Sequence, residues 1–148
     1  MQIGNVYLAT LTFVMGLDML FMACTENNFV RRLSGFLGRD TFVFPPNRFT
    51  NAQPSTRVKD VARDIFKLRN LIAHGKEIPQ NPFRQPYHLT STNGEPLPDI
   101  HYPYTYAELL RESALFLLTA SLRKIFTDPT LASAVNDTRR WRSEMNNF

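Results

Sequence analysis

Residues 58–75 read VKDVARDIFKLRNLIAHG and carry the clearest helical pattern in the chain. Their apolar positions follow one another in alternating steps of three and four, which lines one face of an α-helix. We predict a helix that begins at a capping hydroxyl, Ser55 or Thr56, and ends at Gly75, because glycine readily adopts the left-handed conformation that closes helices. The apolar face consists of Val58, Val61, Ile65, Leu68 and Ile72.

Residues 3–24 form the first predicted helix, which is apolar on nearly every side. Such a helix is central in a bundle or is covered on two sides, and a second copy of the chain would supply the second cover. Asp18 lies inside the segment, where a charge in a bilayer costs about 2.5–3.5 kcal/mol. No Lys or Arg precedes the segment, so it lacks the basic start of a signal peptide. We therefore predict a core helix and no membrane span. The two faces carry Leu8, Leu11, Met15, Met19 and Met22 on one side and Phe13, Val14, Leu17 and Phe21 on the other.

Residues 26–37 form a shorter predicted helix, which Gly38 ends. Arg31 and Arg32 are expected to point away from its apolar edge. The prolines that follow, within residues 45–54, break regular structure and predict a loop. The apolar edge consists of Phe29, Leu33, Phe36 and Leu37.

Residues 105–126 form the predicted fourth helix. It begins with a capping box, in which the Thr105 hydroxyl and the Glu108 carboxylate accept bonds from each other's backbone amides. A second start signal is Asp128, which a proline follows at the first helical position. We expect a last helix from there to about residue 145.

The segment from residue 78 to residue 103 is rich in proline and is predicted to be a long loop. Asn93 and Gly94 form a favoured two-residue hairpin turn, so a short hairpin and an open loop are both compatible with the sequence. Pro96 and Pro98 would confine any such strand to the edge of a sheet.

The 148 residues, 43% hydrophobic and 20% charged, are expected to form one domain over residues 1–148, with residues 127–148 as a C-terminal helix or tail. The predicted fold class is all-α, a helical bundle of about four to five helices with a proline-rich loop before the fourth. The formal net charge of +4 permits an acidic partner such as RNA. The single cysteine, Cys24, is predicted to be a small buried residue of a cytoplasmic protein.

Polar side chains gather near the end of the third predicted helix. Asn70 and His74 are four residues apart and share one face, with Lys67 one turn earlier and Arg63 near it. Arg69 and His74 are about 140° apart around an ideal helix, so they do not stack. Both are nevertheless able to border a groove that a second helix or subunit completes.

An arginine and a histidine together are able to cleave RNA without a metal ion. Histidine titrates near neutral pH as a residue type, so it suits transfer of the proton of the 2′-hydroxyl or of the leaving group. Arginine offers a fork of donors that matches a phosphate and stabilises the charge that develops on phosphorus. His88 and His101 have no Cys, His or Asp at metal-ligand spacing, so we predict no metal and no cofactor.

The segment Arg69-Asn70-Leu71-Ile72-Ala73-His74-Gly75 resembles the Arg-x4–6-His motif of the HEPN superfamily. A polar residue, often Asn, commonly follows the arginine in that family, as it does here. A long helix before the motif, the position of the motif at a helix end and an amphipathic helix after it are similar too. The resemblance therefore extends from the first helix to Phe126, and the tail beyond that residue has no counterpart in the family.

The resemblance implies a helical bundle that dimerises and acts as a metal-independent endoribonuclease, with the motifs of two subunits facing one cleft. By match to the motif, Arg69 and His74 would be catalytic and Asn70 would support them. An acidic residue of the first long helix is sometimes near the site in this family, and Asp18 is the candidate. Members act in toxin–antitoxin pairs, antiviral defence and RNA processing, so RNA, a second copy and an antitoxin or other regulatory protein are the expected partners.

Basic side chains offer further contacts to RNA. Lys67 and Arg63 lie near the motif. The densest basic cluster surrounds Trp141, which suggests binding of RNA by charge and by stacking. A solvated terminal helix that is anchored by one aromatic residue explains the same pattern. The cluster consists of Arg139, Arg140 and Arg142.

Other roles are compatible with the motif residues. Arg69 is equally suited to a structural ion pair with Asp18 or Asp64, and His74 to an interaction with the free carbonyls of a helix end. For the whole chain, the alternative to a ribonuclease is a non-catalytic helical module. Such a module would dimerise, or bind RNA or protein, within a larger defence or regulatory system.

Overall fold

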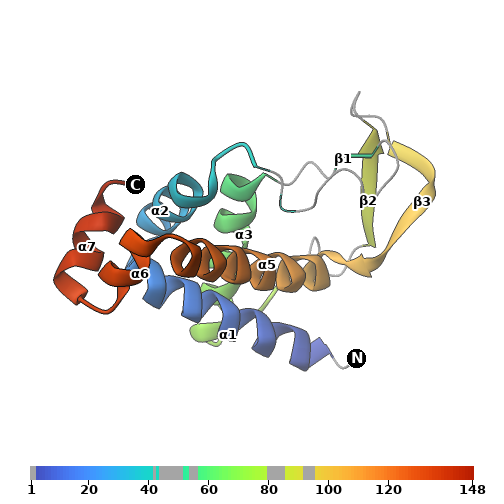
Figure 1. The fold of residues 1–148 in the computed structure, drawn as a ribbon. Helices are drawn as coiled ribbons and strands as arrows, with labels where there is room; N and C mark the ends of the chain where they lie inside the picture. The colour runs from blue at the N-terminus through green and yellow to red at the C-terminus, as the bar shows by residue number, and fades with distance from the viewer. Residues whose placement is uncertain (1–2, 42, 44–51, 54–56, 80–85, 92–95) are drawn as a thin grey trace.

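The computed structural model describes residues 3–41, 43, 52–53, 57–79, 86–91 and 96–148. The body of the molecule is the predicted all-α helical bundle (Figure 1). Within the described residues, four longer helices form the bundle, and two short helices follow at its end. In chain order the helices are α1 (Ile3–Phe21), α2 (Glu26–Leu37), α3 (Val58–Ala73), α5 (Tyr106–Thr127), α6 (Pro129–Val135) and α7 (Thr138–Asn146).

The core lies between α1, α3 and α5, with α2 packed on α3 (Figure 1). Aromatic rings join the layers: Phe21 of α1 meets Phe36 of α2 edge to face, with ring centroids 5.4 Å apart. Edge-to-face pairs of this kind add about 0.5–1.5 kcal/mol to the burial of their surface. The largest fully buried side chains are Leu17, Phe21, Phe29, Leu33, Phe36, Ile65, Leu68, Leu109, Leu110, Leu117 and Ile125.

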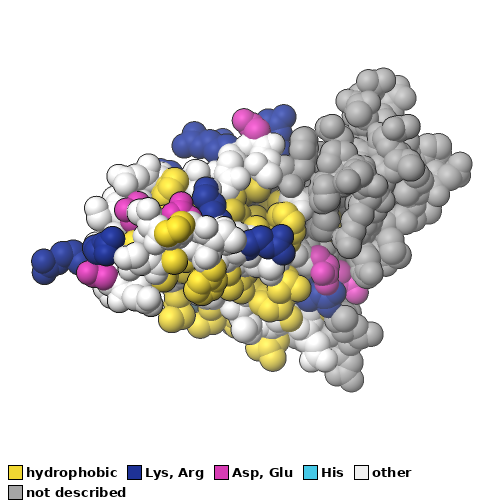
Figure 2. Space-filling view, in the orientation of Figure 1, with side chains coloured by type: hydrophobic (Ala, Val, Ile, Leu, Met, Phe, Trp, Pro, Cys, Tyr) yellow, Lys and Arg dark blue, Asp and Glu magenta, His cyan; other side chains and the backbone are white. Residues whose placement is uncertain are grey.

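Helix α1 turns only one of its two apolar faces to the core. Val14 and Leu17 are fully buried, whereas Leu8 and Met19 on the other side are 62% and 78% exposed. Figure 2 shows the hydrophobic side chains that gather over α1 and α5 on the viewed side. The helix ends at Phe21, three residues before the predicted end. Cys24 is exposed, so the prediction that it is buried is wrong.

No single helix in the described ranges is long and apolar enough to cross a membrane. The bent pair of Asn5–Phe21 and Glu26–Leu37, at 79° to each other, meets that test by length and composition alone. Thr25 lies between the two helices, and its hydroxyl accepts a bond from the backbone N–H of Asn28 as the N-cap of α2.

Helix α3 has the predicted apolar face and the predicted end, but its start differs. It begins at Val58 after Arg57, whose side chain makes no capping bond to the helix. The Arg57 guanidinium instead lies 2.9 Å from the Asp40 carboxylate. The predicted caps, Ser55 and Thr56, lie outside the described residues. The buried positions of the face are Val58, Val61, Ile65 and Leu68, and Ile72 packs against the core from its edge.

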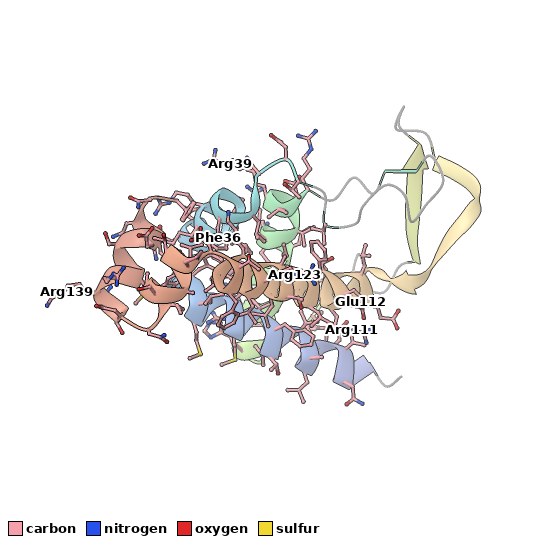
Figure 3. The ribbon with its side chains drawn as sticks, viewed as in Figure 1. Phe36, Arg39, Arg111, Glu112, Arg123 and Arg139 are labelled. Atoms are coloured by element: carbon pink, nitrogen blue, oxygen red, sulfur yellow. The ribbon has the colours of Figure 1, made fainter. Side chains whose placement is uncertain are left out.

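The C-terminal part forms two helices, so the prediction of one continuous helix is wrong. Asp128 caps α6 as predicted, because its carboxylate accepts the backbone N–H groups of Thr130 and Leu131. Asp137 caps α7 in the same way, with a carboxylate that accepts the backbone N–H groups of Arg139 and Arg140. The chain therefore starts a new helix after α6 and does not continue the first one. Arg139 extends from α7 at the end of the body farthest from the strands (Figure 3).

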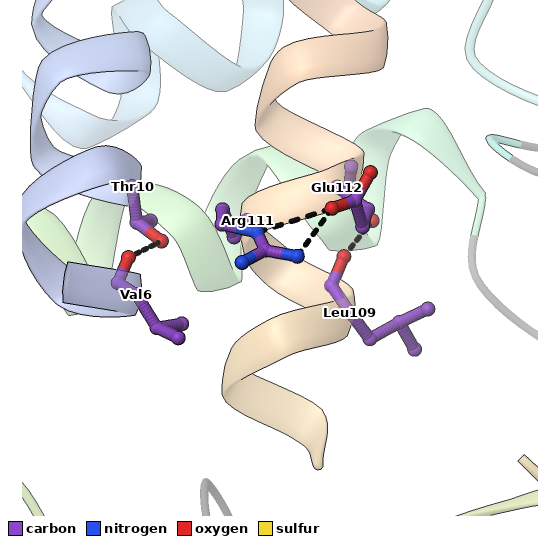
Figure 4. A network of polar contacts seen from close by, with 6 residues as sticks. Val6, Thr10, Leu109, Arg111 and Glu112 are labelled. Atoms are coloured by element: carbon purple, nitrogen blue, oxygen red, sulfur yellow. Dashed lines mark hydrogen bonds and ion pairs between the residues drawn. The ribbon is translucent and has the colours of Figure 1, made fainter. Parts of the chain in front are cut away.

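Hydroxyl groups inside the bundle are satisfied within their own helices. The Thr10 hydroxyl donates to the Val6 carbonyl at 2.8 Å, and the Ser113 hydroxyl donates to the Leu109 carbonyl at 2.6 Å (Figure 4). Each bond reaches back one turn, so neither group needs a partner across the interface of α1 and α5. Beside them, the Arg111 guanidinium pairs with the neighbouring Glu112 carboxylate (Figure 4).

The segment before α5 contains a hairpin, which is one of the two arrangements that the sequence left open. Strands β1 (Ala52–Gln53), β2 (Pro86–Ser91) and β3 (Pro96–Thr105) form an antiparallel sheet in the order β1-β2-β3. The proline-containing β3 is an edge strand, as expected for a residue without a backbone donor. The predicted turn residues Asn93 and Gly94 lie outside the described residues. The sheet projects beyond the helical body (Figure 1).

Candidate functional site

An ion pair joins α1 to α3. Arg69 Nη2 lies 2.9 Å from Asp18 Oδ2, and the two side chains are only 24% and 18% exposed. Of the two acids that the sequence offered to Arg69, Asp18 is therefore an observed partner. Because both groups are largely withdrawn from water, salt screens their attraction less than it screens a surface pair.

Two further contacts hold the Arg69 guanidinium. Its Nη1 donates to Asn70 Oδ1 at 2.8 Å, and its central carbon lies 5.3 Å from the centre of the Phe66 ring. A guanidinium over an aromatic face contributes about 0.5–2 kcal/mol, depending on its exposure. Asn70, which the motif assigned to a supporting role, thus contacts the arginine directly.

The polar centre around Arg69 has unused bonding capacity. Asp18 Oδ1 and Arg69 Nε are buried and have no hydrogen-bond partner among the described residues. Burial raises the pKa of the Asp18 carboxyl above its ordinary value of 3.8, and the charge of Arg69 partly offsets that rise. Buried polar atoms without partners are rare in folded proteins, and perturbed ionisable groups gather at functional sites.

His74 is the exposed C-cap of α3. Gly75 adopts the predicted left-handed conformation, with φ of 60°. Its N–H donates to the Ile72 carbonyl at 3.1 Å, and the next N–H, of Lys76, donates to the Leu71 carbonyl at 2.9 Å. These two bonds form a Schellman motif, which fixes the backbone at the helix end. The imidazole makes no hydrogen bond or ion pair with any described residue, so it is available to a ligand.

The structure brings some of the predicted site residues together and leaves others apart. Asp18, Arg69 and Asn70 are in direct contact, whereas His74 lies at the helix end without a side-chain bond to them. Lys67 is exposed about two turns before the helix end. Within the described ranges, no three His, Cys, Asp or Glu side chains are grouped to hold a metal ion.

Arg32 is a buried residue of this region, and the prediction that it points away from the core is wrong. Only 9% of it is exposed. Its Nη1 donates to the carbonyls of Phe21 and Met22 at 2.9 and 2.8 Å, and its Nη2 donates to Asn146 Oδ1 at 2.8 Å. The last carbonyls of a helix have no partner within the helix, and this guanidinium supplies donors at the end of α1.

Trp141 supplies another donor to the end of α1. It is 4% exposed, and its indole N–H donates to the Leu20 carbonyl at 2.6 Å. A buried indole cannot stack on a base, so the suggested stacking of RNA on Trp141 is wrong. The structure instead has the alternative arrangement, a terminal helix that is anchored by one aromatic residue. The surrounding cluster, Arg139, Arg140 and Arg142, is exposed.

A surface pocket of about 550 Å³ opens beside Asp18. Pockets of this size and mixed character are typical of sites for small molecules. Asp18 therefore contacts Arg69 and also borders a space that is open to solvent. The pocket is lined by Asp18, Met19, Met22, Ala23, Cys24, Arg32, Arg142 and Asn146.

Large apolar side chains are exposed on α1 and α5, and we call this surface the α1–α5 face (Figure 2). Soluble monomers rarely expose contiguous apolar patches of more than a few hundred Å². An uncovered face of this kind is typical of a surface that contacts another protein. Its members are Leu8, Met15, Met19, Leu115, Phe116, Leu122 and Phe126.

No family model matches the chain, and comparisons with curated proteins and with solved structures also find no match. The assignment of a function therefore depends on the chain's own residues. Those that bear on it are the contacts around Arg69, the exposed imidazole of His74 and the α1–α5 face.

Proposed function

We propose that this protein is a metal-independent endoribonuclease of the HEPN type, which cuts RNA in a cleft between two copies of the chain. His74 transfers protons, Arg69 stabilises the charge of the transition state, and Asp18 and Asn70 position Arg69. The proposal includes a cytoplasmic role in a toxin–antitoxin pair or in antiviral defence. The observation that carries it is the set of contacts around Arg69, within the same final turns of α3 that expose His74.

The proposed reaction is a transesterification. The 2′-oxygen of a ribose forms a bond to the adjacent phosphorus while the bond from phosphorus to the 5′-oxygen of the next nucleotide breaks. The 2′-hydroxyl loses a proton to a base, and the 5′-oxygen gains one from an acid. In a cleft between two copies, two His74 imidazoles would be available, one for each transfer. The products are a 2′,3′-cyclic phosphate and a free 5′-hydroxyl.

The environment of Arg69 suits the stabilisation of a phosphorane. Its contacts with Asp18 and Asn70 each use one terminal nitrogen, which leaves further N–H groups for phosphate oxygens. The side chain is 24% exposed, so its direction is fixed while part of it remains within reach of solvent. A positioned donor stabilises developing charge without having to reorient during the reaction.

The α1–α5 face supports the dimeric form of the proposal. Leu8, Met15 and Met19 of α1 are each about half exposed or more, and they lie on the same helix as Asp18. Burial of a side chain of this size contributes about 1.5–3 kcal/mol. A second copy that covers this face would remove that apolar surface from water.

The experiment is incubation of the purified protein with mixed RNA in EDTA, beside His74→Ala. We expect the wild type to leave 2′,3′-cyclic phosphate ends and His74→Ala to be slower by about 100-fold or more, since acid–base groups contribute that much or more. Folding of the variant should be unchanged, because His74 is exposed. Cleavage by His74→Ala at the wild-type rate contradicts the mechanism.

A matched pair of conservative substitutions tests Arg69. Arg69→Lys keeps the charge but loses the fork of donors, so cleavage should fall steeply. Arg123→Lys makes the same change at an exposed position of α5 (Figure 3) and should leave cleavage unchanged. Equal activity of the two variants would contradict the role of Arg69 in the reaction.

The second candidate function is a non-catalytic helical module that dimerises or binds RNA or protein in a larger system. The observation that favours it is the α1–α5 face, which needs a partner whether or not the chain is an enzyme. The absence of cleavage by the wild type, together with a defined dimer in light scattering, would favour this module over the ribonuclease.

A further inference from the structure

A narrow groove between α2 and α3 has a strongly basic lining. Its volume is about 150 Å³, and its wall contains two arginines from α2 and the following turn, Arg31 and Arg39, and two cations from α3, Lys59 and Arg63. None of the lining residues in the described part of the chain is acidic, in contrast to the pocket that Asp18 borders. We call this feature the α2–α3 groove. The remaining lining residues are Asn27, Val30 and Ser34.

The charges of the groove are largely unneutralised. Arg39 and Lys59 are exposed and make no ion pair or hydrogen bond with any described residue. Arg31 donates to the backbone oxygen of Phe148 at 3.2 Å and to Asn28 Oδ1 at 3.4 Å, which are long bonds. Side chains held in this way are free to turn toward a ligand.

Among the described residues, Arg63 is the one cation of the groove that forms ion pairs. It lies 4.0 Å from Glu26 and 4.0 Å from Asp60, and its side chain is 42% exposed. Exposed pairs at this separation contribute little, about 0–1 kcal/mol. A bound phosphate would therefore compete effectively for this guanidinium.

The basic surface continues along α3 to the candidate catalytic histidine. Lys59, Arg63, Lys67, Asn70 and His74 follow one another in steps of four, four, three and four residues, which places them on one side of the helix. At 1.5 Å per residue, this row is about 22 Å long. The α2–α3 groove thus lies at one end of the row, and the exposed imidazole lies at the other.

We infer that the α2–α3 groove binds the phosphodiester backbone of single-stranded RNA and directs it along α3 toward His74. The inference rests on the proposed function and adds the path of the substrate. A row of cations along one helix follows one strand, and a groove of about 150 Å³ is too small to admit a duplex. None of the described residues that line the groove is aromatic, so these residues recognise charge and do not stack on bases.

The test is the anisotropy of a fluorescein-labelled single-stranded RNA, titrated with full-length protein that carries His74→Ala to prevent cleavage. One variant, the groove double, adds Arg39→Glu and Lys59→Glu. The control adds Arg123→Glu (Figure 3), Thr119→Asp and Thr130→Asp, three exposed positions outside the groove. Both variants have a formal net charge of zero in place of +4, because each set of changes lowers the charge by four. We expect the groove double to bind about tenfold more weakly or worse, and the control to bind within about threefold of the parent.

The salt dependence provides a second readout. A neutral double, Arg39→Gln with Lys59→Gln, removes two phosphate contacts. The slope of log affinity against log salt should become shallower by about 1.4, since each contact to a single strand contributes about 0.7. RNA strands of different sequence should give the same slope, because the groove contacts the backbone.

Three outcomes overturn the inference. The first is equal weakening in the groove double and in its control, which would mean that only overall charge matters. The second is the absence of RNA binding by the parent at low salt. The third is a groove double that no longer binds polyglutamate but still binds RNA. This result would mean that the groove binds an acidic protein. Cleavage by His74→Ala would remove the proposed function and would leave the binding result standing.

Discussion

Helix α1 ends with Met22 in the left-handed conformation, at φ of 51°, and helix α3 ends with Gly75 in the same conformation, at φ of 60°. The hydrogen bonds match as well: in α1 they run from Met22 to the Met19 carbonyl and from Ala23 to the Asp18 carbonyl. Glycine adopts this conformation freely, whereas another residue pays about 1–2 kcal/mol for it. The end of α1 therefore contains strain that the end of α3 lacks.

The surroundings of the two helix ends also differ, because the end of α1 is enclosed and the end of α3 is open to solvent. Arg32 and Trp141 enclose the end of α1 and donate to its last carbonyls. No atom of the described residues beyond the chain neighbours lies within 4 Å of the position that a Cβ would take at Gly75, and His74 beside it is exposed. The enclosed end fixes Asp18, and the open end presents an imidazole. This division, with a rigid support and an accessible proton carrier, is what the proposed reaction requires.

The largest expected effect comes from opening the enclosed end. Arg32→Met keeps the volume of the side chain but leaves the buried Phe21 carbonyl and the Met22 carbonyl without donors. Since each unsatisfied group costs about 1–3 kcal/mol, we expect the free energy of unfolding to fall by about 3 kcal/mol. Urea denaturation measures it, with Arg31→Met on the exposed side of α2 as the control, expected within about 0.5 kcal/mol of the wild type. A similar, small loss in both variants would show that the end of α1 does not need the guanidinium.

Asp18 belongs to both ends, because its carbonyl accepts the closing bond of α1 and its carboxylate holds Arg69 of α3. Burial raises the pKa of this carboxyl above 3.8, and Arg69 offsets part of the rise. Between the ordinary and the raised pKa, the folded protein binds more protons than the unfolded chain. The contribution of Asp18 to stability therefore falls as the pH rises through that window.

Asp18→Asn cannot titrate, so the variant isolates this contribution. We subtract the unfolding free energy of Asp18→Asn from that of the wild type. This difference should increase as the pH is lowered from neutral to about pH 4. Denaturant titrations at several pH values measure the difference, in which the other carboxyl groups cancel. A shift in the opposite direction would mean that Arg69 outweighs burial and that the pKa of Asp18 is lowered.

The sequence was sufficient to predict the open end, which is the C-terminal end of α3. The alternation of apolar residues defined α3, Gly75 marked its end, and Asp18 was one of two acids considered for Arg69. The predictions of α3 and of its end rest on local patterns, which a single segment contains in full. Asp18 lies 51 residues before Arg69, and the sequence did not decide between it and Asp64. The break before α7 also has a local signal, because Asp137 is a strong N-cap residue, but the prediction of one helix passed over it.

The enclosed end could not be predicted in the same way. Arg31 and Arg32 are adjacent arginines, so the sequence does not distinguish them. The position of α1 against α2 decides which of the two is buried. Both faces of α1 are apolar, so its pattern does not say which one the core covers. The α2–α3 groove likewise joins cations from two segments, and their proximity depends on helix packing.

The smallest expected effect is at the open end. Gly75→Ala meets no atom within 4 Å, so its only cost is the left-handed backbone, about 1 kcal/mol. Met22→Gly at the equivalent position relieves the backbone but loses the contacts of a partly buried side chain, so its net change should be smaller. Hydrogen exchange at the Lys76 amide, which closes the motif onto Leu71, should accelerate in Gly75→Ala, while exchange in the core of α3 stays slow. If exchange instead accelerated along the whole of α3, the two helix ends would be equally coupled to the core, and the contrast between them would fail.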